Sequence, residues 1–199
     1  MKLINFNNLS KGLSKFKSQK TFPYAVIDNF FSKTAFNDFK YALEEPKWEI
    51  RPRITQKYNR GAGAQRHFGN EEGAFHLSLY PAHIISKELG KEYYCHRMRF
   101  RVAWLCDNAG VRPHIDDYEN DGYKNYDITA VIYMNDSDGD LIIYDCVAPD
   151  PYIEGSEYIR ITPEKNKCVI MMKHYWHHPL TPRETDLRYS ININLKESK

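Results

Sequence analysis

Arg112-Pro113-His114-Ile115-Asp116-Asp117 is the stretch around which the rest of this 199-residue chain can be interpreted. In an extended segment the side chains of residues i and i+2 point to the same side, so His114 and Asp116 would present an imidazole and a carboxylate together. Asp117 would point to the opposite side. The pair can hold two positions around a metal ion, and a third ligand must come from elsewhere in the chain.

Trp176-His177-His178-Pro179 offers two adjacent candidates for that third ligand, on a segment with strand-like composition. Two histidines and one carboxylate leave coordination positions open, which is typical of non-haem Fe(II) sites. Arg188 follows further along the chain. Its planar guanidinium suits the recognition of a carboxylate. Together these residues predict a metal site with an anion-binding group nearby.

The segment from Arg188 to Leu195 alternates strictly between polar and apolar side chains. The polar positions are Arg188, Ser190, Asn192 and Asn194, and the apolar ones are Tyr189, Ile191, Ile193 and Leu195. If the apolar face packs on helices, the polar face would line the interior of a barrel, where a buried arginine needs an anionic partner. A dicarboxylate co-substrate would supply that partner. Thr129 and Tyr133 are in phase on their own strand and could donate hydroxyl groups to the same ligand.

Short segments rich in β-branched and aromatic residues, separated by Asn, Asp, Gly and Pro turns, predict most of the secondary structure. The expected strands are 22–28, 97–105, 126–134, 141–144, 158–162, 167–172 and 188–195. Helices are expected over 33–45, with Ser32 as N-cap, and over 82–93. Two helical segments followed by a series of strands predict a mainly β fold, a sandwich or barrel with flanking helices.

The length fits a single domain spanning residues 1–199. Residues 1–20 are expected to form a polar N-terminal arm, residues 21–96 a strand–helix support, and residues 97–199 the β core. Within the support, residues 51–68 combine arginines with Gly61-Ala62-Gly63-Ala64. This composition predicts a loop, interpreted either as a lid over the substrate or as an exposed charged loop.

Composition restricts the partners and the compartment. The net charge of +2 gives no electrostatic case for a nucleic-acid or acidic-membrane partner. The four cysteines show no zinc-type spacing and are expected to be reduced thiols. Because no apolar run approaches a membrane span, a cytoplasmic, reducing location is expected, which also suits Fe(II).

From about Met98 to Leu195 the sequence resembles the 2-oxoglutarate/Fe(II)-dependent oxygenases, in particular their prolyl-hydroxylase-like branch. The matching motifs are His114-x-Asp116, the strand 128–135, Gly139-Asp140-Leu141, Pro163-x-Lys165-Asn166, His178-Pro179-Leu180-Thr181-Pro182 and Arg188-x-Ser190. Residues 22–31 resemble the strand–helix opening of this branch more weakly. The resemblance implies a double-stranded β-helix, a jelly-roll or cupin-like core, with iron at its open end.

By this resemblance His114, Asp116 and His178 would bind Fe(II). His178 is preferred over His177 because Pro182 then lies four residues on and Arg188 ten residues on, which fits the family spacing better.

The resemblance also implies the co-substrates. Arg188 would pair with the distal carboxylate of 2-oxoglutarate, helped by Ser190 and Tyr133, and Thr129 is a further hydroxyl donor. O2 would be the second co-substrate, and ascorbate an auxiliary reductant that the resemblance allows. Gly139-Asp140 departs mildly from the family's paired glycine.

The implied reaction is hydroxylation of an unactivated C–H bond in a peptidyl residue, prolyl-like, or in a free amino acid or small metabolite. A homodimer is compatible with these expectations. Three alternatives stay open: a cupin-type iron oxygenase without 2-oxoglutarate, in which Arg188 would be dispensable; a metal-free β-sandwich binding module; and a zinc hydrolase. The hydrolase is disfavoured because no glutamate stands in a recognisable general-base motif.

Overall fold

The computed structural model describes residues 24–37, 49–51, 63–67, 81–83, 85–104, 113–116, 126–147, 150, 152–156 and 158–198. No helix among these residues is long and apolar enough to cross a membrane.

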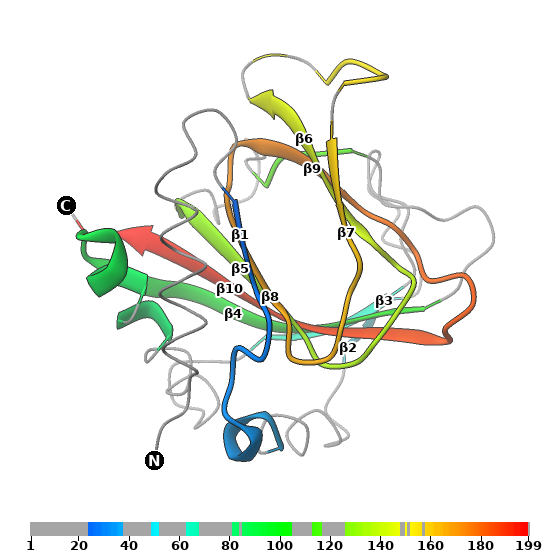
Figure 1. Ribbon diagram of the computed structural model, residues 1–199, viewed down its shortest axis with the longest axis horizontal. Coiled ribbons are helices and arrows are strands. Elements are labelled where there is room, and N and C mark those ends of the chain that lie inside the picture. Colours follow the sequence, from blue (N-terminus) through cyan, green and yellow to red (C-terminus); the bar gives the residue numbers. More distant parts are fainter. Residues whose placement is uncertain are drawn as a thin grey trace.

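Two facing antiparallel sheets make up the fold (Figure 1). The larger sheet has the strand order β1-β8-β5-β10-β4-β3-β2, and the smaller one has the order β7-β6-β9. The strands are β1 (Tyr24–Ile27), β2 (Glu49–Arg51), β3 (Gly63–His67), β4 (Tyr93–Trp104), β5 (Ile128–Tyr133), β6 (Leu141–Val147), β7 (Tyr158–Ile161), β8 (Cys168–Met172), β9 (Tyr175–Pro179) and β10 (Leu187–Glu197). This arrangement confirms the predicted mainly β fold, a double-stranded β-helix with flanking helices.

The outer face of the larger sheet carries the main hydrophobic core. Apolar residues of β4, β5, β8 and β10 pack there against the helical segments, with Phe30, Phe36 and Ile85 inserted from the N-terminal half. The first helix covers residues 33–37, and the Ser32 hydroxyl accepts a hydrogen bond from the Ala35 amide at 3.3 Å, which confirms the predicted N-cap. Its predicted continuation to residue 45 lies outside the described residues.

The second helical segment covers 81–83 and 85–89 and stops earlier than the predicted end at residue 93. Gly90 adopts a left-handed φ of 70°, and its amide donates to the Ser86 carbonyl at 2.9 Å. A glycine in this conformation ends a helix without steric cost. β4 then begins at Tyr93.

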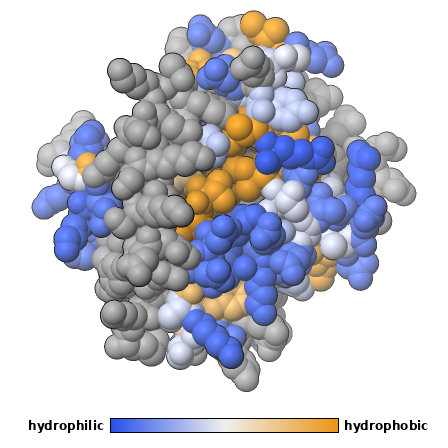
Figure 2. Space-filling view, viewed as in Figure 1, coloured by the Kyte–Doolittle hydropathy of each residue, from blue (hydrophilic) through white to orange (hydrophobic). Residues whose placement is uncertain are grey.

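A second apolar cluster fills the space between the sheets. It includes Val131, Leu141 and Val169, with Tyr24 packed against it from β1 and Ile159 from β7. Figure 2 shows a band of hydrophobic residues near the centre of the face that is drawn in Figure 1, where β1 and β7 lie on either side of the centre. The sheets are therefore joined by apolar packing on this side.

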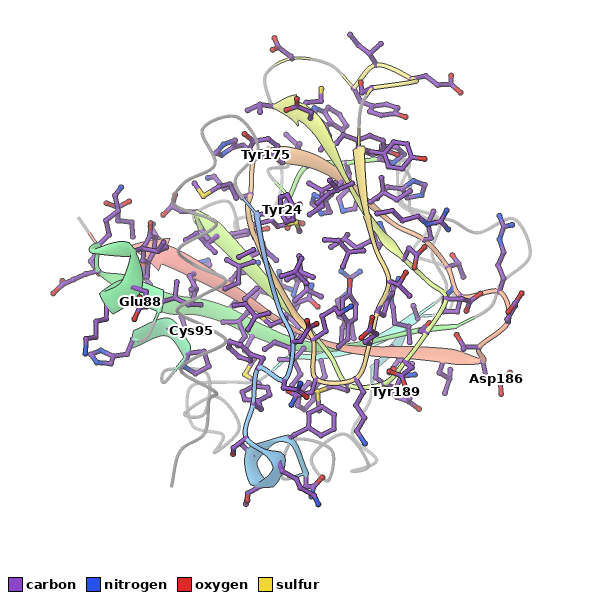
Figure 3. All side chains as sticks on the ribbon, in the orientation of Figure 1. Tyr24, Glu88, Cys95, Tyr175, Asp186 and Tyr189 are labelled. Carbon is purple, nitrogen blue, oxygen red and sulfur yellow. The ribbon has the colours of Figure 1, made fainter. Side chains whose placement is uncertain are left out.

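The predicted two-faced character of the last strand is confirmed. Ile191, Ile193 and Leu195 of β10 are fully buried in the outer core. Tyr189, which is labelled in Figure 3, packs partly against it. Ser190, Asn192 and Asn194 are also buried, but on the opposite face, toward the interior between the sheets. A strand with two buried faces, one of them polar, positions hydrogen-bonding groups inside the fold.

One prediction for residues 51–68 needs correction. Gly63–His67 is not loop: it forms β3 and pairs with β4. Backbone hydrogen bonding to β4 orders this segment, although its glycines had suggested a flexible loop. Residues 52–62 and 68 lie outside the described residues, so the lid interpretation stays a prediction.

Asn166 joins the N-terminal segment to the core. It has a left-handed φ of 64°, its side-chain amide donates to the Phe31 carbonyl at 2.9 Å, and its side-chain oxygen accepts from the Phe31 amide at 2.9 Å. Its own carbonyl accepts from the Phe30 amide at 2.9 Å. Asparagine suits this position because it tolerates left-handed backbone and can imitate a peptide group.

Replacing Asn166 with alanine is expected to lower the free energy of unfolding by about 2–4 kcal/mol, because two buried backbone groups of Phe31 lose their partners. Chemical denaturation of the metal-free protein measures this. Asn29→Ala is the matched control, since Asn29 has a φ of 51° but is exposed. Equal losses in both variants would mean that backbone strain, not hydrogen bonding, is the cause.

Candidate metal and co-substrate site

His114 and His177 meet across an isolated antiparallel bridge. The His114 amide donates to the His177 carbonyl at 2.9 Å, and the reciprocal bond is 2.8 Å long. Residues that face each other in this way project their side chains to the same side. The two rings lie 4.4 Å apart between centroids, and both residues are buried. The backbone therefore brings two imidazoles from distant segments together.

Asp116 completes a cluster with these histidines. Its Oδ1 lies 3.8 Å from His177 Nε2. One potential ligand atom from each of His114, Asp116 and His177 falls within 4.8 Å of the others, and no second group of this kind occurs in the described part of the chain. Two imidazole nitrogens and a carboxylate at this separation match the donor set of a non-haem Fe(II) centre.

The structure places His177, and not the predicted His178, beside His114 and Asp116. β9 alternates, so Tyr175 and His177 point inward and are buried, whereas Trp176 and His178 share the other face and are only partly buried. The Trp176 indole donates to the Asp150 carbonyl at 2.9 Å on that other face, away from His114 and Asp116. The side chain of Trp104 and all of Asp117 lie outside the described residues.

A chain of hydrogen bonds holds the cluster from behind. Thr129 Oγ1 donates to Asp116 Oδ2 at 3.2 Å and accepts from Asn194 Nδ2 at 3.1 Å. Asn194 Oδ1 in turn accepts from Arg99 Nη2 at 3.1 Å. Thr129 was expected to contact the co-substrate, but its hydroxyl is committed to Asp116. This support fixes the carboxylate orientation, as outer residues do in metal sites.

The histidine ring is oriented as well. His177 Nδ1 lies 3.0 Å from the Tyr175 carbonyl, which leaves Nε2 facing Asp116. A hydrogen bond from Nδ1–H to a backbone carbonyl sets the tautomer with a free Nε2, the form that binds a metal.

Asp116 is held in its ionised form. Burial by itself would raise the pKa of this carboxyl group. The nearby His177, His114 and Arg99, together with a hydrogen bond from Tyr126, outweigh burial and hold the pKa well below the usual range. The carboxylate is therefore available as a ligand at neutral pH.

Arg188 is anchored at the other end of the interior. Its Nη1 donates to the Leu180 carbonyl at 2.6 Å and also to the Gly139 carbonyl. A side chain at Gly139 would approach the Leu180 carbonyl and the Pro182 ring within 3.0 Å, so glycine allows these segments to converge on the guanidinium. Burial lowers the pKa of Arg188, but Tyr133 and Asp140 oppose this shift.

The turn before β10 is held by Asp138. Its carboxylate accepts from the amides of Arg183 and Glu184, each at 2.9 Å, and from the Thr185 hydroxyl at 2.6 Å. Burial would raise the pKa of Asp138, but these hydrogen bonds lower it below the usual range. The turn fixes where β10 begins and therefore where Arg188 lies.

Tyr133 and Ser190 are direct cross-strand partners, so their side chains share the interior face with Arg188. Tyr133 is fully buried, and burial raises its pKa to about 12, so the hydroxyl keeps its proton. Among the described residues that hydroxyl has no hydrogen-bond partner, whereas the Ser190 hydroxyl donates to Asn192 Oδ1 at 3.2 Å. The structure thus brings three of the four predicted co-substrate residues together.

The interior faces of β5 and β10 form a polar strip that runs from Thr129, beside the metal-binding cluster, to Tyr133 and Arg188. The length of this strip suits a dicarboxylate. Thr129 and Tyr133 are four residues apart on β5, roughly 13 Å at the rise of a strand. The His–Asp–His cluster stands beside Thr129, and the long side chains of Tyr133 and Arg188 reach in from the far end. A ligand could chelate a metal at one end and place its distal carboxylate at the other. The residues therefore fit both Fe(II) and 2-oxoglutarate.

The supporting residues Arg99, Tyr126 and Asn194 were not assigned to the site from sequence. The role of Asn194 could have been predicted from the sequence, because it lies on the polar face of β10 in phase with Arg188. Arg99 is likewise in phase with Arg97 and Arg101 on β4. The role of Tyr126 could not have been predicted in this way, because Tyr126 precedes β5 and approaches Asp116 only in the tertiary structure.

Sequence comparison identifies the protein class that this fold and site define. Residues 99–196 match the family model described as the 2OG-Fe(II) oxygenase superfamily. The chain belongs to this superfamily and is a 2-oxoglutarate/Fe(II)-dependent oxygenase that uses Fe(II), 2-oxoglutarate and O2. No curated protein matches the sequence.

Solved structures with the same fold include three with informative ligands or names. A Pseudomonas putida prolyl-4-hydroxylase has 14% identity and a TM-score of 0.64, with 96% of this chain and 100% of that chain covered. A Trichoplax adhaerens prolyl hydroxylase, in complex with a hypoxia inducible factor peptide fragment, has 12% identity and a TM-score of 0.65, with coverages of 96% and 90%. HygX from Streptomyces hygroscopicus, with nickel, 2-oxoglutarate and hygromycin B bound, has 12% identity and a TM-score of 0.64, with coverages of 94% and 86%.

Proposed function

We propose that this oxygenase hydroxylates an unactivated C–H bond in a peptidyl residue, prolyl-like, or in a free amino acid or small metabolite. Fe(II) is held by His114, Asp116 and His177, and the distal carboxylate of 2-oxoglutarate by Arg188. The observation that carries the proposal is the convergence of the three ligand atoms within 4.8 Å, at one end of a polar strip that has Arg188 at its other end.

When bound, Fe(II) and 2-oxoglutarate supply with O2 the oxidising chemistry, in which 2-oxoglutarate is converted to succinate and CO2. His114 and His177 offer neutral nitrogens and Asp116 a carboxylate, and these three ligands leave positions for co-substrates. Arg188 neutralises the distal carboxylate, and the Tyr133 hydroxyl, which keeps its proton, donates a hydrogen bond to it. The apolar cluster around Val131 and Leu141 excludes water from this end.

Support for the substrate classes comes from the structural relatives. The Trichoplax enzyme is complexed with a peptide fragment, and HygX binds hygromycin B, a small molecule. We propose a cytoplasmic, reducing location, since no disulfide bond joins Cys95, Cys146 and Cys168 to one another in the described part of the chain.

An anaerobic titration with Fe(II) and then 2-oxoglutarate tests the proposal. The chelate of both is expected to produce a weak visible charge-transfer band, and succinate release on admitting O2 in a screen of peptides and amino acids then identifies substrates. Absence of the band in protein that has bound Fe(II) would contradict the 2-oxoglutarate assignment and favour the cupin-type alternative. Failure to bind Fe(II) at all would favour a metal-free binding module.

A further inference from the structure

Three arginines of β4 point into the interior beside the proposed site. Arg97, Arg99 and Arg101 are the cross-strand partners of Asn194, Asn192 and Ser190, whose side chains are buried on the interior face of β10. Facing residues in an antiparallel pair share a side, so the three guanidinium groups extend over that face. Arg188 lies on the same face of β10, where its guanidinium donates to the carbonyls of Gly139 and Leu180.

Two of these cations, Arg99 and Arg101, form no ion pair with a carboxylate among the described residues. Within the same part of the chain, Arg99 Nε is buried without a hydrogen-bond partner. A guanidinium removed from water without a partner carries a large desolvation cost. The Arg99 guanidinium makes one hydrogen bond, in which its Nη2 donates to Asn194 Oδ1. Arg101 makes no hydrogen bond to any described residue.

The electrostatic surroundings of Arg101 are strongly positive. Burial first, and then Arg99 and Arg188, lower its pKa to about 10, while Asp116 opposes the shift. The side chain therefore stays charged at neutral pH. Among the described residues Asp116 is the one carboxylate with an appreciable effect on it, and Asp116 is committed to the metal.

The proposed ligands do not neutralise these arginines. The two carboxylates of 2-oxoglutarate and Asp116 together balance the charges of Fe(II) and Arg188. Arg99 and Arg101 remain as a pair of positive charges at the wall of the site. Such a pair favours an anion that enters after the metal and the co-substrate are bound.

We infer that Arg101, with Arg99 beside it, binds an anionic group, a carboxylate or a phosphate, on the primary substrate. This inference rests on the proposed function and narrows it. An acid, an amino acid with a free carboxylate or an acidic peptide fits the site better than a neutral prolyl residue. Arg101 acts as a substrate-binding residue, and Arg99 both supports Asp116 and reinforces the positive potential.

Inorganic sulfate is the probe that tests the site without a known substrate. Protein loaded with Ni(II) and 2-oxoglutarate is titrated with sulfate at constant ionic strength, and thermal unfolding and calorimetry follow binding. We expect saturable one-to-one binding that Arg101→Gln weakens at least about tenfold and Arg101→Lys weakens less. Arg183→Gln is the matched control, because Arg183 is exposed.

Absence of saturable sulfate binding, or an equal effect of Arg101→Gln and Arg183→Gln, would overturn the inference. Loss of 2-oxoglutarate binding in Arg101→Gln at least as severe as in Arg188→Gln would also overturn it, since Arg101 would then hold the co-substrate. The charge-transfer band of the Fe(II) chelate is measured separately, so a failure of the proposed function is recognised by its absence.

Matched pairs of compounds distinguish the two anion chemistries. N-acetyl-L-proline is compared with N-acetyl-L-prolinamide, and glycerol 3-phosphate with glycerol, as competitors of sulfate. The charged member of at least one pair is expected to displace sulfate, and its neutral partner is not. Displacement by the neutral members with equal affinity would contradict a site for anions.

Discussion

Replacing His177 with alanine is expected to weaken Fe(II) binding by more than about 100-fold, because it removes a direct ligand, and loss of supporting residues alone costs 10–100-fold. Replacing the adjacent His178 with alanine is expected to change the affinity about twofold or less, as for a residue outside the site. Anaerobic calorimetry of the metal-free variants with Fe(II), or with Mn(II) as a redox-stable substitute, measures both affinities.

The two variants control for each other, since each removes one imidazole from the same strand. The His177 backbone bonds to His114 survive the alanine substitution, so circular dichroism and thermal unfolding of the metal-free proteins should differ little. Loss of metal binding in His178→Ala with retention in His177→Ala would show that β9 presents its other face to the metal. Loss in both would indicate a collapse of β9.

Which of the two adjacent histidines joins the cluster could not be predicted from spacing along the sequence. The preference for His178 came from its spacing to Pro182 and Arg188, which assumes a connection of standard length. In the structure the carboxylate of Asp138 accepts hydrogen bonds from the amides of Arg183 and Glu184 in the turn between β9 and β10, so this turn sets the spacing between the histidines and Arg188. The phase of β9 was the better signal, because Tyr175 and His177 must share a face and Tyr175 belongs to the core.

Other parts were predictable because they depend on local alternation. The two faces of β10 and the pairing of His114 with Asp116 follow from side-chain periodicity along one segment. The Ser32 cap follows from a hydroxyl placed directly before a helix. β3 was missed because its stability comes from pairing with β4, not from its own glycine-containing sequence. Thr129 was correctly predicted to point into the interior, but its hydroxyl binds Asp116 and not the co-substrate. This contact could not be predicted, because it depends on the path of the chain between β4 and Asp116.

Arg188→Gln is expected to weaken 2-oxoglutarate binding by about 2–4 kcal/mol, or 30- to 1000-fold, because the distal carboxylate would remain buried without its cation. Arg188→Lys should recover only part of this loss. An ammonium group keeps the charge, but it lacks the planar guanidinium that can donate to a carboxylate and to the two carbonyls at the same time. The intensity of the chelate band against 2-oxoglutarate concentration measures the dissociation constant in each variant.

The structure makes this substitution informative about mechanism as well as affinity. Arg188 also bridges Gly139 and Leu180, so part of its effect could come from a looser β6–β9 edge. Fe(II) affinity separates the two contributions, because the ligands His114, Asp116 and His177 lie at the other end of the strip and should bind metal normally in Arg188→Gln. A variant that binds Fe(II) but requires far more 2-oxoglutarate has lost only the distal contact. If Arg188→Gln instead kept wild-type affinity for 2-oxoglutarate and full turnover, the distal carboxylate would have to be held by another cation. Among the described residues Arg101 would be the first candidate, because it is the cross-strand partner of Ser190 on the same interior face.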